Sequence, residues 1–204
     1  LGVDRMYTAM IPLGHRPPTI VEEAGPHVTC TLVGGDPILP IAELFEQIRP
    51  LPRRRDMRVA VIVDLLLHSP FTTFDAVATA LQTDAEGAGA ALRATAQCTV
   101  AEAPLIERYA DAWLLGNGPR RIAMPARRAP WFADVVGYAS TRAEQCLSTA
   151  RQWCRAFETI STGDLMRLAG VSRGTAQKIL ATMAERQELR RIGSGRATAY
   201  RLAR

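Results

Sequence analysis

The strongest helical spacing of apolar residues lies in the last third of the chain. Between residues 173 and 186, apolar side chains recur at the i, i+3, i+4, i+7 and i+8 positions that form one face of a helix. They are Ala176, Ile179, Leu180, Met183 and Ala184. A shorter helix is expected at 163–169, and Gly170 would form the turn between the two. Val171 is then the buried residue that fixes the angle between these helices.

Polar caps and a hairpin signal surround this helix pair. Ser161 or Thr162 precedes the first helix and Ser172 precedes the second, and such side chains accept hydrogen bonds from the first free backbone N–H groups. Ile160 is expected to form a short strand. Alternating residues predict two further strands at 189–192 and 198–202, and the glycine-rich segment 193–196 predicts a tight turn between them. This order of elements is typical of a winged helix-turn-helix.

The preceding part of the chain repeats that order in a weaker form. Apolar spacing predicts helices at 3–11, 41–48, 53–69, 74–81, 84–96 and 141–158. Alternation predicts strands at 27–35, 104–107 and 112–115. Thr73 and Thr83 are the expected caps of the fourth and fifth helices. Helix, capped helix, turn, capped helix and two strands therefore occur twice.

We predict an α+β, helix-rich fold with two tandem winged helix-turn-helix units preceded by a short helix-strand segment. Residues 1–40 are expected to be a helix and strand remnant of an upstream domain, and residues 41–118 a degenerate winged helix. A linker rich in Gly, Pro and Arg follows at 119–140, and a C-terminal winged helix-turn-helix at 141–204. The chain begins at Leu1 without an initiator Met, so we expect a piece of a longer protein.

Positive charge is concentrated at the end of the chain. Residues 151–204 hold eleven basic and four acidic residues, whereas the whole chain has a net charge of only +5. A polyanion-binding face is the functional interpretation, and a solvated surface is the structural alternative. The predicted helix at 173–186 favours a polyanion-binding face over a merely solvated surface. Arg173, Gln177 and Lys178 lie on its outward face, which carries no acid before Glu185.

These side chains suit DNA. Arg, Gln and Lys can donate to base edges in the major groove, and the helix start at Ser172 offers free N–H groups to a phosphate. Arginines on the predicted hairpin can contact the backbone or, at the tip, the minor groove: Arg190, Arg191, Arg196 and Arg201. The equivalent helix of the first unit exposes Asp84 and Glu86 instead, so we expect it to pack against neighbours or dimerise.

Sequence patterns for catalysis or metal binding are missing. The four cysteines form no closely spaced pair, the three histidines lie in unrelated segments, and no phosphate-binding loop or nucleophile elbow occurs. No apolar run approaches the roughly 18 to 20 residues of a membrane span. We therefore expect no enzyme, no cofactor, no metal and no small-molecule substrate, and a cytoplasmic protein with free thiols.

Residues 1–35, with their LGVDRM helix, Pro-rich turn and strand ending in Gly-Gly, resemble the end of the middle region of bacterial proteins with a divergent-AAA (Schlafen-like, AlbA-like) N-terminal domain. These are often described as transcriptional regulators or RecG-helicase-related. GVSRGTAQKIL and RRIGSGRATAYRL look like their C-terminal winged helix, which also resembles that of Fic-family proteins. The resemblance implies that nucleotide-binding parts would lie upstream.

Three hypotheses follow. The first is a DNA-binding module of a transcriptional regulator, with double-stranded DNA as partner and a homodimer to extend the site. The second is a protein-interaction or oligomerisation module of a larger ATPase- or helicase-related protein. The third is a remnant enzyme domain that the upstream part would complete.

Overall fold

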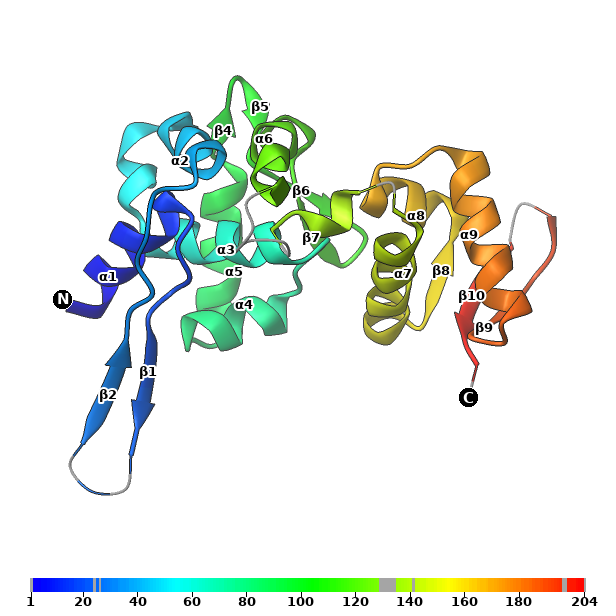
Figure 1. The fold of residues 1–204 in the computed structure, drawn as a ribbon, viewed down its shortest axis with the longest axis horizontal. Coiled ribbons are helices and arrows are strands. Elements are labelled where there is room, and N and C mark those ends of the chain that lie inside the picture. Colours follow the sequence, from blue (N-terminus) through cyan, green and yellow to red (C-terminus); the bar gives the residue numbers. More distant parts are fainter. Residues whose placement is uncertain are drawn as a thin grey trace. The chain divides into compact units, whose positions relative to one another are not determined.

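The computed structural model describes residues 2–23, 25, 27–128, 135–140, 142–195 and 198–203. The chain divides into two compact units, Leu1–Val135 (unit 1) and Val136–Arg204 (unit 2) (Figure 1). Helices dominate both, and the strands form small antiparallel sheets. The expectation of a helix-rich α+β fold is confirmed.

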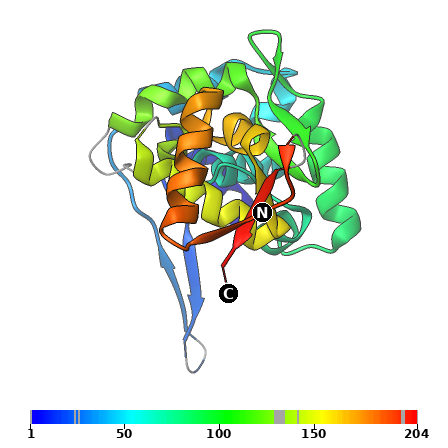
Figure 2. The same ribbon diagram turned by 90° about the vertical axis from the view of Figure 1, so that its right-hand side faces the viewer.

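Unit 1 begins with a helix and a hairpin. Helix α1 (Gly2–Met10) and the short 3₁₀ helix η1 (Ile11–Leu13) precede strands β1 (Thr19–Glu22) and β2 (Val28–Thr31). The strands pair with Ile20 opposite Cys30, and every residue in both is exposed. The hairpin projects away from the helices of unit 1 in both views (Figures 1 and 2). The first helix and β2 were predicted, whereas β1 was not.

The core of unit 1 forms around α2 (Leu39–Glu46) and α3 (Met57–His68), which are separated by strand β3 (Ile48–Arg49) and the 3₁₀ helix η2 (Leu51–Arg55). Leu44, Ile62 and Leu66 are fully buried. The predicted start of the long helix at Arg53 is wrong. Helix α3 starts at Met57 because the Asp56 carboxylate caps it, accepting a hydrogen bond from the Arg58 N–H at 3.1 Å.

Asp56 also sets a pH dependence. Its carboxylate accepts hydrogen bonds from Arg53 at 2.7 Å and from Arg58 at 3.1 Å. Burial acts to raise the pKa of Asp56, but the hydrogen bonds from Arg58 and Arg53 together outweigh it and lower the pKa. The stabilisation is therefore present above the unfolded pKa of about 3.9 and is lost as pH falls through the lower folded value.

Asp56→Ala is expected to reduce the free energy of unfolding by about 1 kcal/mol at neutral pH, through loss of the cap and of the charge-assisted bonds. Urea denaturation at several pH values would measure the difference from the native chain, which should shrink as the pH falls below the unfolded pKa of about 3.9. Asp36→Ala removes an exposed loop carboxylate and is the control. A difference that stays constant down to the lowest pH would contradict this role.

Two capped helices and two hairpins complete the middle of unit 1. Thr73 caps α4 (Phe74–Leu81) as predicted, but Asp84 rather than Thr83 caps α5 (Ala85–Ala96). Short strands follow: β4 (Thr99–Val100), β5 (Ala103–Pro104), β6 (Ile106–Tyr109) and β7 (Ala112–Leu115). They form the sheets β3-β4-β5 and β6-β7, and Thr72 bridges to Trp113 on β7.

The segment after β7 is helical where a linker was expected. Helix α6 (Asn117–Ala123) and the 3₁₀ helix η3 (Met124–Arg128) pack against α2. Pro119 lies in the first turn of α6, where a missing N–H costs nothing, and Ala123 and Ala126 are buried. This part of the predicted linker at 119–140 is therefore a packed element of unit 1.

In the described part of unit 2, three α-helices pack against one sheet. After η5 (Gly137–Ala139) come α7 (Ala143–Phe157), β8 (Thr159–Ser161), α8 (Thr162–Ala169), α9 (Arg173–Glu185), β9 (Leu189–Ile192) and β10 (Ala199–Leu202). The sheet order is β8-β10-β9, with both pairings antiparallel. Ile160, Leu165 and Leu180 are fully buried between the sheet and the helices.

The two units share an order of elements. In unit 1, α3 is followed by Thr72, α4, α5, the short strands β4 and β5, and then β6 and β7, with Thr72 bridging to the last strand. In unit 2, α7 is followed by β8, α8, α9, β9 and β10, with β8 paired to the last strand. The two units thus share part of an order of elements, but β4 and β5 have no counterpart in the described part of unit 2, and the tandem winged-helix arrangement stays a prediction.

Candidate nucleic-acid interface

Local hydrogen bonds fix the start of each helix in unit 2. Ser161 and Asp164 cap α8 reciprocally, with the Ser161 N–H donating to Asp164 at 2.6 Å and the Asp164 N–H donating to the Ser161 hydroxyl at 3.2 Å. Gly170 ends α8 in the left-handed region at φ 68°, which favours glycine. Ser172 caps α9 through the Thr175 N–H at 3.2 Å. Val171, 8% exposed, lies between the two helices.

Helix α9 has a buried face and a basic exposed face. Ala176, Leu180 and Met183 are fully buried and Ile179 nearly so, while Ala184 is only half-buried. The outward face is exposed at Ser172, Arg173, Gln177 and Lys178. The structure therefore brings these four predicted site residues together on one side of one helix.

The cations of this face are not neutralised by the rest of the described chain. Arg173 and Lys178 form no ion pair with another described residue. Two acids of unit 2 are engaged elsewhere, because Glu188 accepts from Arg151 at 2.7 Å and Asp164 belongs to the α8 cap, whereas Glu144 lines the same groove as Lys178 without an ion pair to it. The face therefore keeps two unpaired positive charges.

The hairpin β9–β10 adds a second basic element. Arg190 and Arg201 lie directly opposite one another in the pairing, and both are exposed. Like charges at such positions repel, and an anion beside them removes the penalty. Arg191 is opposite Tyr200 and donates to the Thr198 hydroxyl at 3.3 Å. The predicted contact at Arg196 lies outside the described residues.

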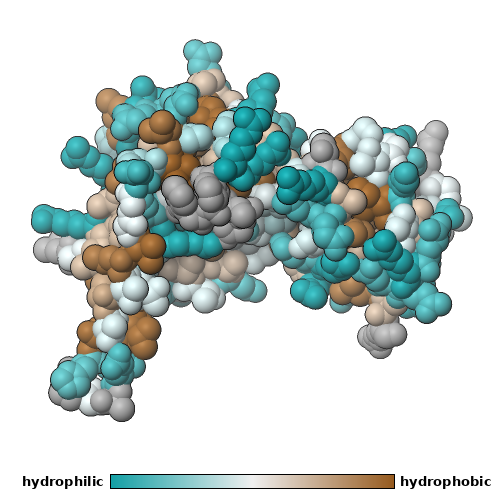
Figure 3. Space-filling model, viewed as in Figure 1, coloured by the Kyte–Doolittle hydropathy of each residue, from teal (hydrophilic) through white to brown (hydrophobic). Residues whose placement is uncertain are grey.

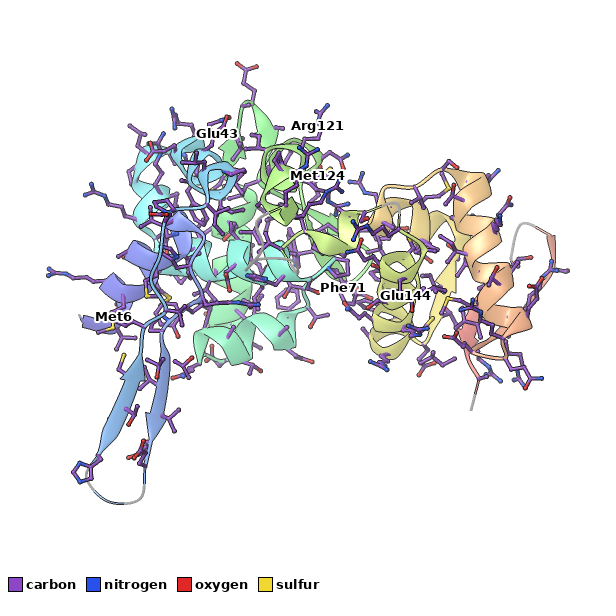
Figure 4. The ribbon with its side chains drawn as sticks, in the orientation of Figure 1. Met6, Glu43, Phe71, Arg121, Met124 and Glu144 are labelled. Atoms are coloured by element: carbon purple, nitrogen blue, oxygen red, sulfur yellow. The ribbon has the colours of Figure 1, made fainter. Side chains whose placement is uncertain are left out.

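A groove of about 520 Å³ lies beside α9, and the first turns of α7 form its other wall. Leu147 and Ile179 give it an apolar floor, and Thr175 and Lys178 line its α9 side. Glu144, at the start of α7, lies in the lining as well (Figure 4). The start of α9 is therefore open on this side rather than packed under α7.

The corresponding helix of unit 1 has a different face. Asp84 and Glu86 are exposed at the start of α5, and the Asp84 carboxylate accepts from the Gly87 N–H at 2.8 Å. Buried residues recur along it at Ala88, Gly89, Ala91, Leu92 and Thr95. An acidic start and a largely buried body do not suit phosphate contact.

Sequence reasoning missed an exposed group of arginines in unit 1. Arg121, Arg127 and Arg128 are exposed on α6 and η3, within the segment expected to be a linker. The sequence did contain a sign of this basic surface, because residues 112–133 contain four arginines and no Asp or Glu.

The thiols of unit 2 serve packing. Cys146 and Cys154 are buried in the α7 face that meets the sheet and α8. Burial raises the pKa of the Cys146 thiol, and burial together with the Asp164 charge raises that of Cys154 to about 11. Neither is poised to react.

No described cluster of His, Cys, Asp or Glu could hold a metal ion, and no helix in the described ranges is long and apolar enough to span a membrane.

Comparisons with known proteins relate unit 2 to a regulator domain and unit 1 to a family of unknown function. Residues 39–124 match a family of unknown function, DUF5635, and residues 141–203 match the C-terminal domain of DIP2311-like transcriptional regulators. The curated proteins gave no match. The crystal structure of the DIP2311 protein from Corynebacterium diphtheriae is 46% identical with a TM-score of 0.91, over 98% of this chain and 36% of that one. This chain therefore spans about a third of that protein, and its residues 141–203 are related to a transcriptional-regulator C-terminal domain.

Proposed function

We propose that residues 159–202 form a winged helix-turn-helix that binds duplex DNA as part of a transcriptional regulator. In this proposal α9 enters the major groove, where Arg173 and Gln177 donate to base edges and Lys178 holds a phosphate or a guanine. The free N–H groups at the Ser172 cap bind one phosphate. Arg190, Arg191, Arg196 and Arg201 on and beside the β9–β10 hairpin bind the backbone.

One observation carries the proposal. The exposed face of α9 presents donors without an acidic partner among the described residues, next to a hairpin on which Arg190 and Arg201 are paired across the strands. Such an arrangement is electrostatically unfavourable until a polyanion binds it. The match of residues 141–203 to a regulator domain supports the same function.

The proposal extends to the rest of the chain. Unit 1 is a second, degenerate winged helix, and its acidic α5 mediates packing or dimerisation rather than DNA contact. A homodimer would present two α9 helices to two half-sites, because one unit reads few base pairs. The protein acts in the cytoplasm, and the chain itself catalyses no reaction. The parent protein is a relative of the divergent-AAA regulators, whose nucleotide-binding part is not in this chain.

The test is a fluorescence anisotropy titration of the whole chain against labelled duplex DNA at several salt concentrations. Arg173→Ala combined with Lys178→Ala is expected to weaken binding about 10-fold or more and to reduce the slope of log K against log salt by about 1 to 2. The reason is that each lost phosphate contact leaves about one counterion unreleased.

A matched control removes two positive charges from other surfaces. Arg5→Ala combined with Arg155→Ala changes exposed residues on α1 and α7 and should leave the salt slope unchanged. If the α9 variant and this control bind DNA as tightly as the native chain, α9 is not the DNA-binding helix.

A protein-interaction function is the second candidate, and the β1–β2 hairpin favours it. Ile20, Val21 and Val28 are 43%, 49% and 63% exposed, and apolar side chains are visible along the hairpin (Figure 3). An isolated two-stranded hairpin is marginally stable in water, so a covering partner is expected. We propose that residues of a larger domain cover this hairpin, whereas α1, in the same segment 1–40, packs against α3 of unit 1. Absence of DNA binding by the native chain at low salt would favour this candidate.

A further inference from the structure

Three exposed arginines follow one another within a short stretch of α6 and η3 in unit 1. Arg121, Arg127 and Arg128, which we term the α6–η3 surface, lie within eight residues of sequence and are all exposed. Figure 4 labels Arg121 on α6 and Met124, the first residue of η3. None of the three arginines forms an ion pair with another described residue.

This surface is held by packing. Helix α6 contacts α2 and β5, and η3 contacts α2 as well. Pro119 and Ala123 of α6 and Ala126 of η3 are buried. Arg120, only 6% exposed, belongs to the packed side, so its neighbour Arg121 faces out. A rigid backbone lowers the entropy lost when the arginine side chains bind a ligand.

The local charge is strongly positive. Residues 112–133 carry four arginines and no acid. Of the acids on the adjoining α2, Glu46 is bonded to Arg54 at 2.8 Å, and Glu43 accepts from Gln47 at 3.3 Å. Glu43 is visible on α2 in Figure 4. Among the described acids on or next to the elements that α6 and η3 contact, only Glu43 and Glu102, in the turn before β5, are exposed without a cation that balances them, so the three guanidinium groups leave a net positive charge.

We propose that the α6–η3 surface binds the phosphate backbone of the same duplex that unit 2 reads, as a sequence-independent second contact. The inference rests on the proposed function in taking duplex DNA as the ligand. Guanidinium groups match phosphate geometry bidentately, and several arginines on one short stretch of chain with no acid between them suit a backbone that presents repeated phosphates. Because both units belong to one chain, binding by either one raises the effective DNA concentration at the other, up to the millimolar range for a short linker.

The test compares Arg121→Gln/Arg127→Gln/Arg128→Gln with the native chain in anisotropy titrations on duplexes of unrelated sequence. The slope of log K against log salt should fall in magnitude by about 2 to 3, equally for every sequence. Between about 50 and 200 mM salt the native chain should then lose about 40-fold more affinity than the variant. Arg121→Lys/Arg127→Lys/Arg128→Lys keeps the charges and should retain most of the slope.

A charge-matched control separates this surface from net charge. Arg5→Gln/Arg93→Gln/Arg108→Gln removes three exposed arginines from α1, α5 and β6. If this control variant lowers the salt slope as much as the α6–η3 variant does, the proposal is overturned. An unchanged slope for the α6–η3 variant would also overturn it, and would leave an acidic protein surface as the partner class for these arginines.

The outcomes also distinguish this inference from the proposed function. If Arg173→Ala/Lys178→Ala weakens binding while the α6–η3 variant does not, the proposed function stands and the second contact does not exist. If the α6–η3 variant alone loses slope, the backbone contact stands and α9 is not the reading helix. If the native chain binds no duplex, both proposals fail.

Discussion

Leu180→Ala is expected to destabilise unit 2 by about 2–5 kcal/mol, and DNA binding through unit 2 should be lost with its fold. Leu180 is fully buried on α9, where its side chain lies under the exposed basic face. A unit of this size has a total stability of only about 3–10 kcal/mol at roughly 0.05–0.15 kcal/mol per residue. The cavity left by the substitution therefore removes much of what keeps α9 folded.

Hydrogen exchange followed by mass spectrometry would locate this effect. Peptides from residues 143–202 should exchange faster in Leu180→Ala, while peptides from residues 39–115 in unit 1 should be unchanged. Gln177→Ala is the control on the opposite face of the same helix, and its stability should lie within about 0.5 kcal/mol of the native value. Equal acceleration in both sets of peptides would show that the two units unfold together.

Gly116→Ala is expected to destabilise unit 1 by about 1–3 kcal/mol or more, although a single methyl group is added. At φ −58° and ψ 154° the backbone itself would accept alanine without strain. The added Cβ, however, would collide with the backbone carbonyl oxygen of Pro104, which cannot rotate away. Helix α6 would have to move away from β5, carrying the α6–η3 surface with it.

Gly174→Ala is the matched comparison, measured in the same thermal unfolding experiment. A Cβ at Gly174 meets nothing within 4 Å, and the residue lies in the first turn of α9. Replacing a helical glycine with alanine should stabilise unit 2 by up to about 1 kcal/mol. A neutral or stabilising Gly116→Ala would mean that the contact between α6 and β5 is looser than the structure indicates.

Elements that begin with a polar cap and bury one regular stripe were predictable. Thr73 and Ser172 mark the starts of α4 and α9, and the apolar stripe of α9 predicted its buried face apart from Ala184. The β9–β10 hairpin was equally clear, because Gly193 and Gly195, both with positive φ, separate two alternating segments. In each case a local signal within a few residues determines the structure.

Elements that depend on distant partners were not predictable. Pro119, Pro125 and two glycines made α6 and η3 look like a loop, and their helical state depends on burial of Ala123 and Ala126 against α2. Strand β1 has four residues and no buried side chain, so its pairing with β2 leaves no apolar pattern. Strand β3 was missed for another reason, because two residues are too few to show an alternating pattern.

The candidate site likewise has some residues that were predictable from the sequence and others that were not. The outward residues of α9 follow from helical periodicity, so Arg173, Gln177 and Lys178 could be named from the sequence. The pairing of Arg190 with Arg201 required the strand register, and the isolation of Arg173 and Lys178 required knowing that Glu188 binds Arg151. The exposure of Arg121 required the tertiary packing of α6.

The distribution of thiols has a practical consequence. Cys98, Cys146 and Cys154 are buried with raised pKa values, and Cys154, at about 11, is ionised in only about one molecule in a thousand at pH 8. Cys30 is exposed on β2 of the projecting hairpin. A maleimide dye should therefore attach to this hairpin in the native sequence, giving a single fluorescent reporter without any engineered cysteine.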